Sequence, residues 1–226
     1  MKLLNRLGIA WRAERLKCRT DIELFLLPSL VEPHSFAIDI GANKGVYSYH
    51  LQKLARVAAF EPIPMLAEQI ADAGFNRIEV HNCGLGREPG YFELRIPFSE
   101  KDKKELNTPS ATFRTLAAIP GQKQLCFHVE VKRLDDFRFD NVSFMKVDVE
   151  GWEEQVLEGG EETIANNRPV ILIELVERIA PGVFDFVKSF LSKHGYEMFF
   201  AEHGGRKLHS LATLNSDNPQ AYNFLA

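Results

Sequence analysis

Residues 36–45, with the sequence FAIDIGANKG, constrain the fold of this chain more than any other stretch. Residues 36–40 are a short, mostly apolar run, as expected for a strand that is covered on both faces of a parallel sheet, and residues 46–54 continue with apolar side chains at helical spacing. Gly41 and Gly45 lack a Cβ atom, so the backbone can turn sharply and a ligand can closely approach the amides at the helix start. The stretch therefore predicts a strand, a glycine turn and a helix that bind a nucleotide-type ligand.

Two classes of ligand use this geometry. A dinucleotide-binding turn reads G-x-G-x-x-G, but Asn43 and Lys44 occupy the places where close approach of a pyrophosphate requires a second glycine. Asp39 stands at the strand end, and an acidic residue beside the turn suits the α-amino group of a methionine-like moiety. The turn therefore favours S-adenosylmethionine, with an ordinary strand turn as the alternative.

Length and charge limit the classes of protein to consider. A chain of 226 residues suits one α/β domain with a sizeable core. A net charge of −4 is not the basic balance of a protein that binds phosphate backbones, so we expect no nucleic-acid partner. Cys18, Cys83 and Cys126 are widely spaced, which indicates neither a disulfide framework nor a Cys-x-x-Cys metal site and favours a reducing compartment.

Residues 1–35 are expected to form one or two helices that cap the domain or border its entrance, and residues 36–226 the domain itself. The first 20 residues carry six basic side chains against one acid, which allows a targeting segment or a membrane-surface helix as an alternative. Leu3, Leu7 and Trp11 recur every four residues and predict a helix that packs this stripe on the domain or on a partner. No stretch approaches the ~20 apolar residues of a transmembrane segment, so we expect a cytoplasmic protein.

The following segments continue the alternation of strand and helix. Further parallel strands are expected at 56–60, 77–82, 142–149 and 170–175, with helices at 65–73, 153–166 and 184–194. Residues 196–201 are expected to form a further strand and residues 222–225 one more strand at the edge, with one antiparallel strand late in the order. This order predicts an α/β fold with a doubly wound, mostly parallel sheet.

The alternation breaks between the third and fourth parallel strands. Residues 91–96 and 126–131 alternate apolar and polar side chains, as antiparallel strands exposed on one face do. Between them lie the charged run 99–107 and residues 108–113. We expect this β insertion to cover a ligand and to take part in substrate selection.

Polar residues are expected at the carboxyl ends of the strands, where open α/β sheets bind their ligands. They are Asp39, Glu61, Asn82, Asp148 and Glu174. Glu61 lies 20 residues after Gly41, where a carboxylate can accept both hydroxyls of a ribose, whether that of NAD or of S-adenosylmethionine. Residues 82–83 are expected over the edge of the adenine, unless Asn82 only forms a turn.

Three charged side chains lie in the segment FMKVDVEGWE at 144–153. Lys146, Asp148 and Glu150 share one face if this segment is a strand, because side chains alternate with a period of two. A mostly apolar strand with three charges on one side indicates more than a core strand. The alternative is a buried ion-pair network in which Lys146 neutralises a carboxylate.

Taken in order, these segments resemble the FkbM-type methyltransferases. The resemblance rests on residues 36–48, 60–62, 145–159 and 171–174. It implies a class I, Rossmann-like fold that uses S-adenosylmethionine. It also implies, as the usual activity, O-methylation of a hydroxyl on a sugar, glycolipid or polyketide-type product, so that the acceptor is a small molecule or a glycan.

The resemblance further implies which residues bind the cofactor. The methionine part would contact Asp39, Gly41, Ala42, Asn43 and Gly45. The rest of the cofactor would contact Glu61 and Pro62 at the ribose, the turn Asn82-Cys83-Gly84 at the adenine, and Asp148. Family members commonly have alanine at the position of Gly84.

Methyl transfer to a hydroxyl requires removal of the hydroxyl proton, by a carboxylate base or through a bound cation. Asp148, with Glu150 or Glu174, is the candidate catalytic group. Repulsion between neighbouring carboxylates should raise the pKa of at least one of them. A divalent metal such as Mg2+ would relieve the same repulsion and is possible but not predicted, and the lack of histidine in the cluster argues against zinc.

Three other interpretations stay open. A non-catalytic binding module would keep the nucleotide pocket and lose the acceptor site. An NAD-dependent oxidoreductase is disfavoured by the missing second glycine. A nucleic-acid methyltransferase is disfavoured by the acidic balance and by the absence of an Asn-Pro-Pro-Tyr segment. The sequence leaves the identity of the acceptor and the oligomeric state open.

Overall fold

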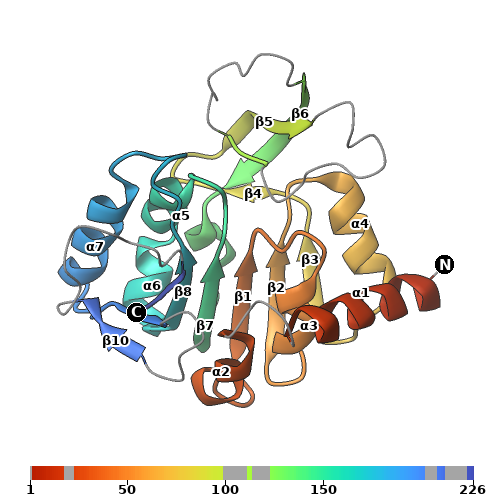
Figure 1. Cartoon of the computed structure of the whole chain (residues 1–226), viewed down its shortest axis with the longest axis horizontal. Helices are drawn as coiled ribbons and strands as arrows, with labels where there is room; N and C mark the ends of the chain where they lie inside the picture. Colours follow the sequence, from red (N-terminus) through yellow and green to blue (C-terminus); the bar gives the residue numbers. More distant parts are fainter. Residues whose placement is uncertain (1, 18–22, 99–110, 114–122, 202–207, 212–222) are drawn as a thin grey trace.

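The computed structural model describes residues 2–17, 23–98, 111–113, 123–201, 208–211 and 223–226. These residues form one main sheet with helices on both faces and a second, smaller sheet at one end (Figure 1). The predicted α/β fold with a mostly parallel, doubly wound sheet is confirmed, and so is the β insertion between the third and fourth parallel strands.

The strand order of the main sheet reverses near its centre. In spatial order, the described strands are β10 (Leu208–Ser210), β9 (Phe199–Ala201), β11 (Asn223–Leu225), β8 (Val170–Glu174), β7 (Val142–Val147), β1 (Phe36–Ile40), β2 (Arg56–Phe60) and β3 (Ile78–His81). Neighbours from β8 to β3 are parallel, whereas β11 is antiparallel to β8 and β9. The order reverses between β1 and β7, which places a ligand crevice beyond the carboxyl ends of these two strands.

Alternation along the strands decides which side chains each face buries. One face is covered by α2 (Glu23–Leu30), α3 (Val46–Leu51) and α4 (Pro64–Asp72), and the other by α5 (Glu153–Gly159), α6 (Glu161–Asn167) and α7 (Val183–Lys193). In β1, Ala37 packs in the core of the first face, while Ile38 and Ile40 pack in the core of the second. Asp39 points to the first face, where it meets Ser48 of α3.

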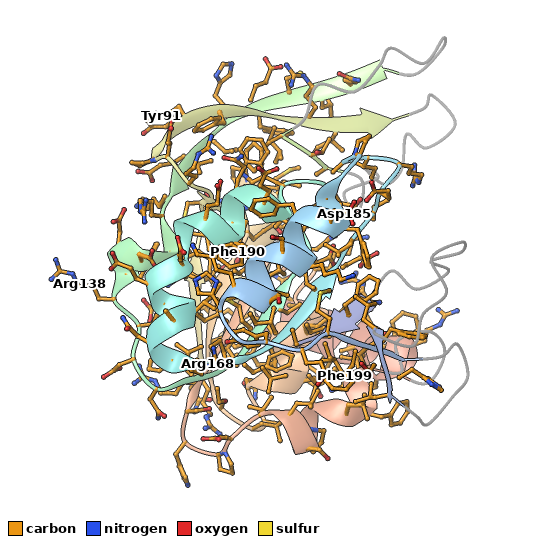
Figure 2. All side chains as sticks on the ribbon, turned by 90° about the vertical axis from the view of Figure 1, so that its left-hand side faces the viewer. Tyr91, Arg138, Arg168, Asp185, Phe190 and Phe199 are labelled. Atoms are coloured by element: carbon orange, nitrogen blue, oxygen red, sulfur yellow. The ribbon has the colours of Figure 1, made fainter. Side chains whose placement is uncertain are left out.

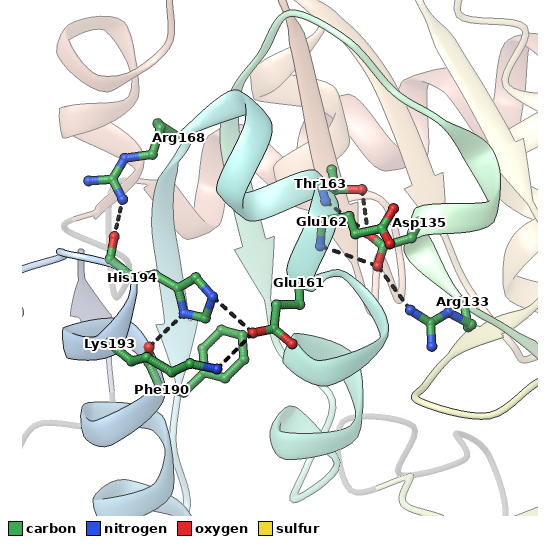
Figure 3. A network of polar contacts seen from close by, with 9 residues as sticks. All are labelled: Arg133, Asp135, Glu161, Glu162, Thr163, Arg168, Phe190, Lys193 and His194. Atoms are coloured by element: carbon green, nitrogen blue, oxygen red, sulfur yellow. Dashed lines mark hydrogen bonds and ion pairs between the residues drawn. The ribbon is translucent and has the colours of Figure 1, made fainter.

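Charged side chains fasten the helices of the second face to one another (Figure 3). Asp135, in the short 3-10 helix η3 (Leu134–Phe137), accepts hydrogen bonds from the backbone N and the Oγ1 of Thr163, both at 2.8 Å, and so binds the first turn of α6. Oε1 of Glu161 lies 3.1 Å from Nζ of Lys193 and 3.0 Å from Nε2 of His194, which joins α6 to the end of α7.

The smaller sheet lies over the carboxyl ends of the main strands (Figure 1). Its order is β4 (Gly84–Leu85), β6 (Lys123–Lys132) and β5 (Gly90–Phe98), with β5 antiparallel to β6 and an exposed Tyr91 on β5 (Figure 2). Thr112 adds an isolated antiparallel bridge to Arg95. The charged run 99–107 and residues 108–110, predicted as part of a cover, lie outside the described residues.

The single helix predicted at 153–166 is wrong, because the chain forms two helices that meet at Gly159 and Gly160. The break falls at Gly160, whose φ of −119° and ψ of 15° are not helical, and α5 also makes a close contact with the loop after β4. A Cβ atom on Gly159 would lie 2.1 Å from the carbonyl oxygen of Gly86, so this contact requires glycine.

The position predicted for residues 222–225 is also wrong, because β11 is not an edge strand. It pairs with β8 on one side and with β9 on the other. Phe224 is buried in the core of one face and Leu225 in the core of the other. A strand with apolar side chains on both faces is best placed inside a sheet.

Helix α1 (Lys2–Lys17) packs on α3 and α4, but not through the stripe that its sequence predicts. Ile9 and Ala13 are fully buried on this side. Leu7 and Trp11 are 56% and 64% exposed, and the side chain of Leu3 lies outside the described set. The predicted packing of the stripe on the domain is therefore wrong, because four-residue spacing is met equally by the opposite face of the helix.

Candidate functional site

The glycine turn after β1 approaches the end of β7 closely. Gly41 has φ +79°, and a Cβ atom on it would lie 1.9 Å from the carbonyl oxygen of Asp148. Backbone therefore meets backbone here, and a side chain at Gly41 would push the two strand ends apart. The missing Cβ atom of Gly41 was expected to allow the approach of a ligand, and in the structure its absence allows the contact between the two loops.

Glu61 joins this turn to the end of β2. Its side chain is buried, with Oε2 accepting a hydrogen bond from the backbone N of Asn43 at 2.7 Å and Oε1 one from the backbone N of Ile63 at 2.8 Å. Burial raises the pKa of Glu61 to about 7, although the two amides lower it. A carboxylate has about four lone-pair sites, so both oxygens can still accept hydroxyl donors.

Asn82 supports the same loop from β3. Its Nδ2 donates to the carbonyl oxygens of Glu61 at 2.8 Å and Pro62 at 3.2 Å. This geometry agrees with the alternative of a turn-forming Asn82. Next along the chain, Cys83 is buried, and burial raises the pKa of its thiol to about 11, so it is a neutral lining group.

A buried ion-pair network lies beneath this turn, on the α3 side of the sheet. Nζ of Lys146 is 2.7 Å from Oδ2 of Asp148 and 4.6 Å from the centre of the Tyr47 ring. Burial alone would lower the pKa of Lys146, but the carboxylates of Asp148 and Asp39 raise it overall. Lys146 therefore stays a cation, as the ion-pair alternative supposed.

Asp39 belongs to this network and not to the surface of the cavity. It is fully buried, and its Oδ2 accepts a hydrogen bond of 2.6 Å from Oγ of Ser48. Burial raises its pKa, while Lys146 and Ser48 lower it. Its predicted contact with the cofactor stays a prediction, to which this position gives no direct support.

Glu150 reaches the cavity through a turn, since β7 ends at Val147. The strand predicted to extend to residue 149, with Asp148 and Glu150 on one face, is therefore wrong at its end. Glu150 has the left-handed φ of 49°, and its carbonyl oxygen accepts a hydrogen bond of 2.7 Å from Oγ1 of Thr112. The insertion thus holds the turn that carries Glu150.

Three carboxylates face one another across this cavity. Burial, followed by the negative charges of Asp148 and Glu174, raises the pKa of Glu150 to about 8. A rise in the pKa of at least one carboxyl was predicted from repulsion between carboxylates, and for Glu150 burial is the larger cause and the neighbouring carboxylates the smaller one. Within the part of the chain that the structure describes, no group of three or more His, Cys, Asp or Glu side chains is arranged to hold a metal ion.

The cavity has a volume of about 200 Å³ and lies at the crevice between β1 and β7. The predicted residues that line it are Gly41, Asn43, Glu61, Pro62, Cys83, Gly84, Asp148, Glu150 and Glu174. Four predicted residues are not among the lining residues: Asp39, Ala42, Gly45 and Asn82. The structure thus brings together most of the predicted site.

The insertion was expected to cover a ligand, but the sequence analysis did not name the apolar side chains by which it lines the cavity. Leu94, Ala111 and Phe113 line the cavity, and the Phe113 ring lies 5.2 Å from the ring of Trp152. The alternating pattern of β5 could have indicated Leu94 as an inward residue. Ala111 and Phe113 belong to the stretch 108–113 that was expected to cover a ligand, and the pairing of Thr112 with Arg95 fixes their position at the cavity.

The reversal of strand order, the glycine turn and the acid after β2 are those of a class I methyltransferase with a Rossmann-like fold. The Methyltransferase FkbM domain model matches residues 39–198, and the chain belongs to this family. Family membership removes the NAD-dependent oxidoreductase from the alternatives.

Curated relatives and a solved structure agree with this assignment. The chain is 25% identical over 183 residues to Methyltransferase 1 of Beauveria bassiana, covering 72% of each chain. It is 24% identical over 152 residues to the 2-O-methyltransferase NoeI of Sinorhizobium fredii, covering 62% of this chain and 63% of the relative. The crystal structure of Methyltransferase FkbM from Methylobacillus flagellatus KT matches in fold, with a TM-score of 0.54, 18% identity, and coverage of 85% of this chain and 44% of that one.

Proposed function

We propose that this chain transfers a methyl group from S-adenosylmethionine to a hydroxyl of a sugar, glycolipid or natural-product acceptor, with the cofactor bound in the cavity at the Gly41 turn. The observation that best supports this proposal is the half-buried Glu150, which lines the cavity with Asp148 and Glu174. Burial raises the pKa of its carboxyl to about 8. The name of the relative NoeI, a 2-O-methyltransferase, supports oxygen as the atom that is methylated.

The chemistry of the cavity fits the cofactor. When bound, S-adenosylmethionine supplies an electrophilic methyl group on a sulfonium cation, together with an amino group and two ribose hydroxyls. Among the described residues that line the cavity, several are acidic, and an acidic lining favours a cationic ligand. Glu61 can accept the ribose hydroxyls, because its backbone partners leave lone pairs on both oxygens.

Glu150 suits the role of general base better than Asp148. One carboxylate oxygen of Asp148, Oδ2, already accepts a hydrogen bond from Nζ of Lys146 at 2.7 Å, so this carboxylate is engaged in an ion pair. Glu150 forms no ion pair in the described structure, and its pKa lies near neutral pH, where a general base is most effective. A cation beside Glu150 would lower this pKa, so that the side chain becomes a carboxylate able to accept the proton of the acceptor hydroxyl.

The test is turnover with a panel of hydroxylated sugars, glycolipids and polyketide-type compounds, detected as a gain of one methyl group in the product. With a found acceptor, Glu150→Gln should reduce turnover by about 10²- to 10⁴-fold, the usual contribution of a general base. Binding of S-adenosylhomocysteine should change little. Glu154→Gln, on α5 and four residues further along the chain, is the matched control and should leave turnover unchanged.

Other outcomes would redirect the proposal. Full turnover of Glu150→Gln would remove Glu150 as the base, and Asp148→Asn and Glu174→Gln would then be measured. Loss of turnover on addition of EDTA, restored by Mg2+, would replace the base by a metal-assisted route. Cofactor binding without methylation of any acceptor in the panel would favour a binding module.

A further inference from the structure

The outward side of α1 is apolar although its other side already packs on the domain. Ile9 is fully buried and clusters with Ala73 and Phe75 after α4. On the opposite side of the helix, Leu4, Leu7 and Trp11 are 73%, 56% and 64% exposed. Their spacing of i, i+3 and i+7 makes one continuous stripe. This stripe, with Arg15, is called the α1 face below.

Positive charge borders the α1 face. The guanidinium of Arg15 lies 5.1 Å from the centre of the Trp11 ring, so the cation and the indole form one unit. The helix sequence contains five basic residues and one acid, Glu14. The guanidinium of Arg6 lies 5.2 Å from the centre of the Phe75 ring and Nη1 of Arg12 is buried, so these two basic side chains contact the domain and Arg15 is the one that lies against the stripe. Oε1 of Glu14 is 2.7 Å from Nζ of Lys53, which neutralises that acid. The whole chain has a net charge of −4, so the basic character is local to this helix.

We propose that the α1 face binds an anionic lipid surface, with α1 lying in the plane of the headgroups. An interfacial helix combines an apolar stripe, aromatic residues and basic side chains in this way. The apolar side chains enter the boundary between headgroups and acyl chains, while the basic side chains meet the negative headgroups. This mode of binding needs no spanning segment, and among the described residues no helix is long and apolar enough to cross a membrane.

Charge and area favour a lipid surface over a second copy of the chain. A two-fold contact through the α1 face would bring the basic side chains of two copies together. A stable protein interface also buries about 800 Å² on each partner, which three side chains of one helix cannot supply. A lipid surface supplies negative charge and an apolar interior without requiring a complementary shape.

Membrane binding through the α1 face would leave the cavity accessible. Among the described residues, none that lines the cavity comes from α1. Figure 1 shows α1 beside α4 at the flank of the main sheet, away from the smaller sheet that lies over the cavity. This inference therefore stands independently of the chemistry proposed for the cavity.

The experiment is sedimentation of the full chain with vesicles of phosphatidylcholine alone and of phosphatidylcholine mixed with phosphatidylglycerol. Binding should require phosphatidylglycerol and weaken with added salt. Replacing the stripe by Leu4→Ser, Leu7→Ser and Trp11→Ser together should reduce binding by about tenfold or more, and Arg15→Glu should also reduce it. Tyr91→Ser, at a side chain that is 77% exposed on β5 (Figure 2), is the matched control and should bind as the wild type does.

Two further readouts separate binding from misfolding and from self-association. The triple variant should keep the melting temperature and the cofactor affinity of the wild type. Anionic vesicles should shift tryptophan emission to the blue in the wild type but not in Trp11→Phe. The proposal is wrong if the wild type ignores anionic vesicles, or if the folded triple variant binds them equally. It is also wrong if the α1 face instead mediates association of two copies, seen as a doubled mass that the triple variant abolishes.

Discussion

Acidic side chains serve opposite purposes in two regions of this molecule. At the cavity, burial raises the pKa of Glu61 to about 7 and that of Glu150 to about 8. Between α6 and α7, the hydrogen bond from Lys193 and the charges of Lys193 and His194 lower the pKa of Glu161 (Figure 3). The first region keeps carboxyls close to their protonation equilibrium at neutral pH, whereas the second favours the charged form of its carboxylate.

The difference lies in what surrounds each carboxyl. Glu161 is partly exposed and lies next to Lys193 and His194, so it links α6 to the end of α7. Glu61 is held by backbone amides, and Glu150 faces two other carboxylates. Neither forms an ion pair within the described residues. Such unneutralised acids are costly for folding and useful for binding a cation or moving a proton.

The largest expected effect comes from the contact that brings the cavity carboxylates together. Gly41→Ala combines a φ of +79° with a Cβ atom 1.9 Å from the carbonyl oxygen of Asp148, so the β1 and β7 loops must separate. We expect a loss of about 3 kcal/mol or more in the free energy of unfolding, together with loss of cofactor binding. Chemical denaturation and calorimetry measure the two.

Gly182→Ala is the control for this variant in the α6–α7 region. Gly182 has a similar φ of +86°, but a Cβ atom there meets nothing within 4 Å. It should show only the backbone strain of about 1 kcal/mol and keep full cofactor affinity. Equal losses in the two variants would mean that strain, and not the contact with Asp148, decides the effect.

Removing one acid from each region, Glu61 at the cavity and Glu161 between α6 and α7, should distinguish a residue that binds the cofactor from one that only links two helices. Glu61→Ala should weaken the binding of S-adenosylhomocysteine by about 1.5–3 kcal/mol, the range for hydrogen bonds to a charged group. Glu161→Ala should leave this affinity unchanged. Calorimetry at one pH compares them, and an unchanged affinity in folded Glu61→Ala would exclude Glu61 from the site.

The dependence of stability on pH should have opposite signs in the two regions. A carboxyl whose folded pKa is raised, such as Glu150, contributes stability that is fully present below its unfolded pKa of about 4.5 and lost as the pH rises through about 8. Glu161, whose folded pKa is lowered, contributes stability above its unfolded pKa that is lost as the pH falls below it. The melting temperature of Glu150→Gln should therefore fall less than that of the wild type as the pH rises from 6 to about 8.5. An identical slope would mean that Glu150 titrates normally.

The smallest effect is expected from the exposed ion pairs. Glu161→Gln should lower the free energy of unfolding by about 0.2–1 kcal/mol, because exposed ion pairs contribute little. The loss should shrink in high salt. A loss of several kcal/mol, measured by urea denaturation, would mean that the α6–α7 network is worth more than its exposure suggests.

Much of the fold and of the cofactor site follows from local sequence. Residues 36–40 are mostly apolar, and the glycines at 41 and 45 permit the left-handed backbone of a tight turn, so this strand and its turn could be predicted before any contact was known. Glu61 follows its own strand in the same way. Local periodicity and backbone freedom are properties of neighbouring residues, and the sequence records them directly.

Tertiary structure alone decided how these pieces serve function. Which carboxylate Lys146 neutralises, and the left-handed turn that Thr112 holds at Glu150, depend on segments far apart in the chain. The sequence equally could not show that α1 buries Ile9 and leaves Trp11 exposed, because helical spacing describes both faces alike. The pKa of Glu150 depends on burial and on charges from other strands, and these exist only once the chain has folded.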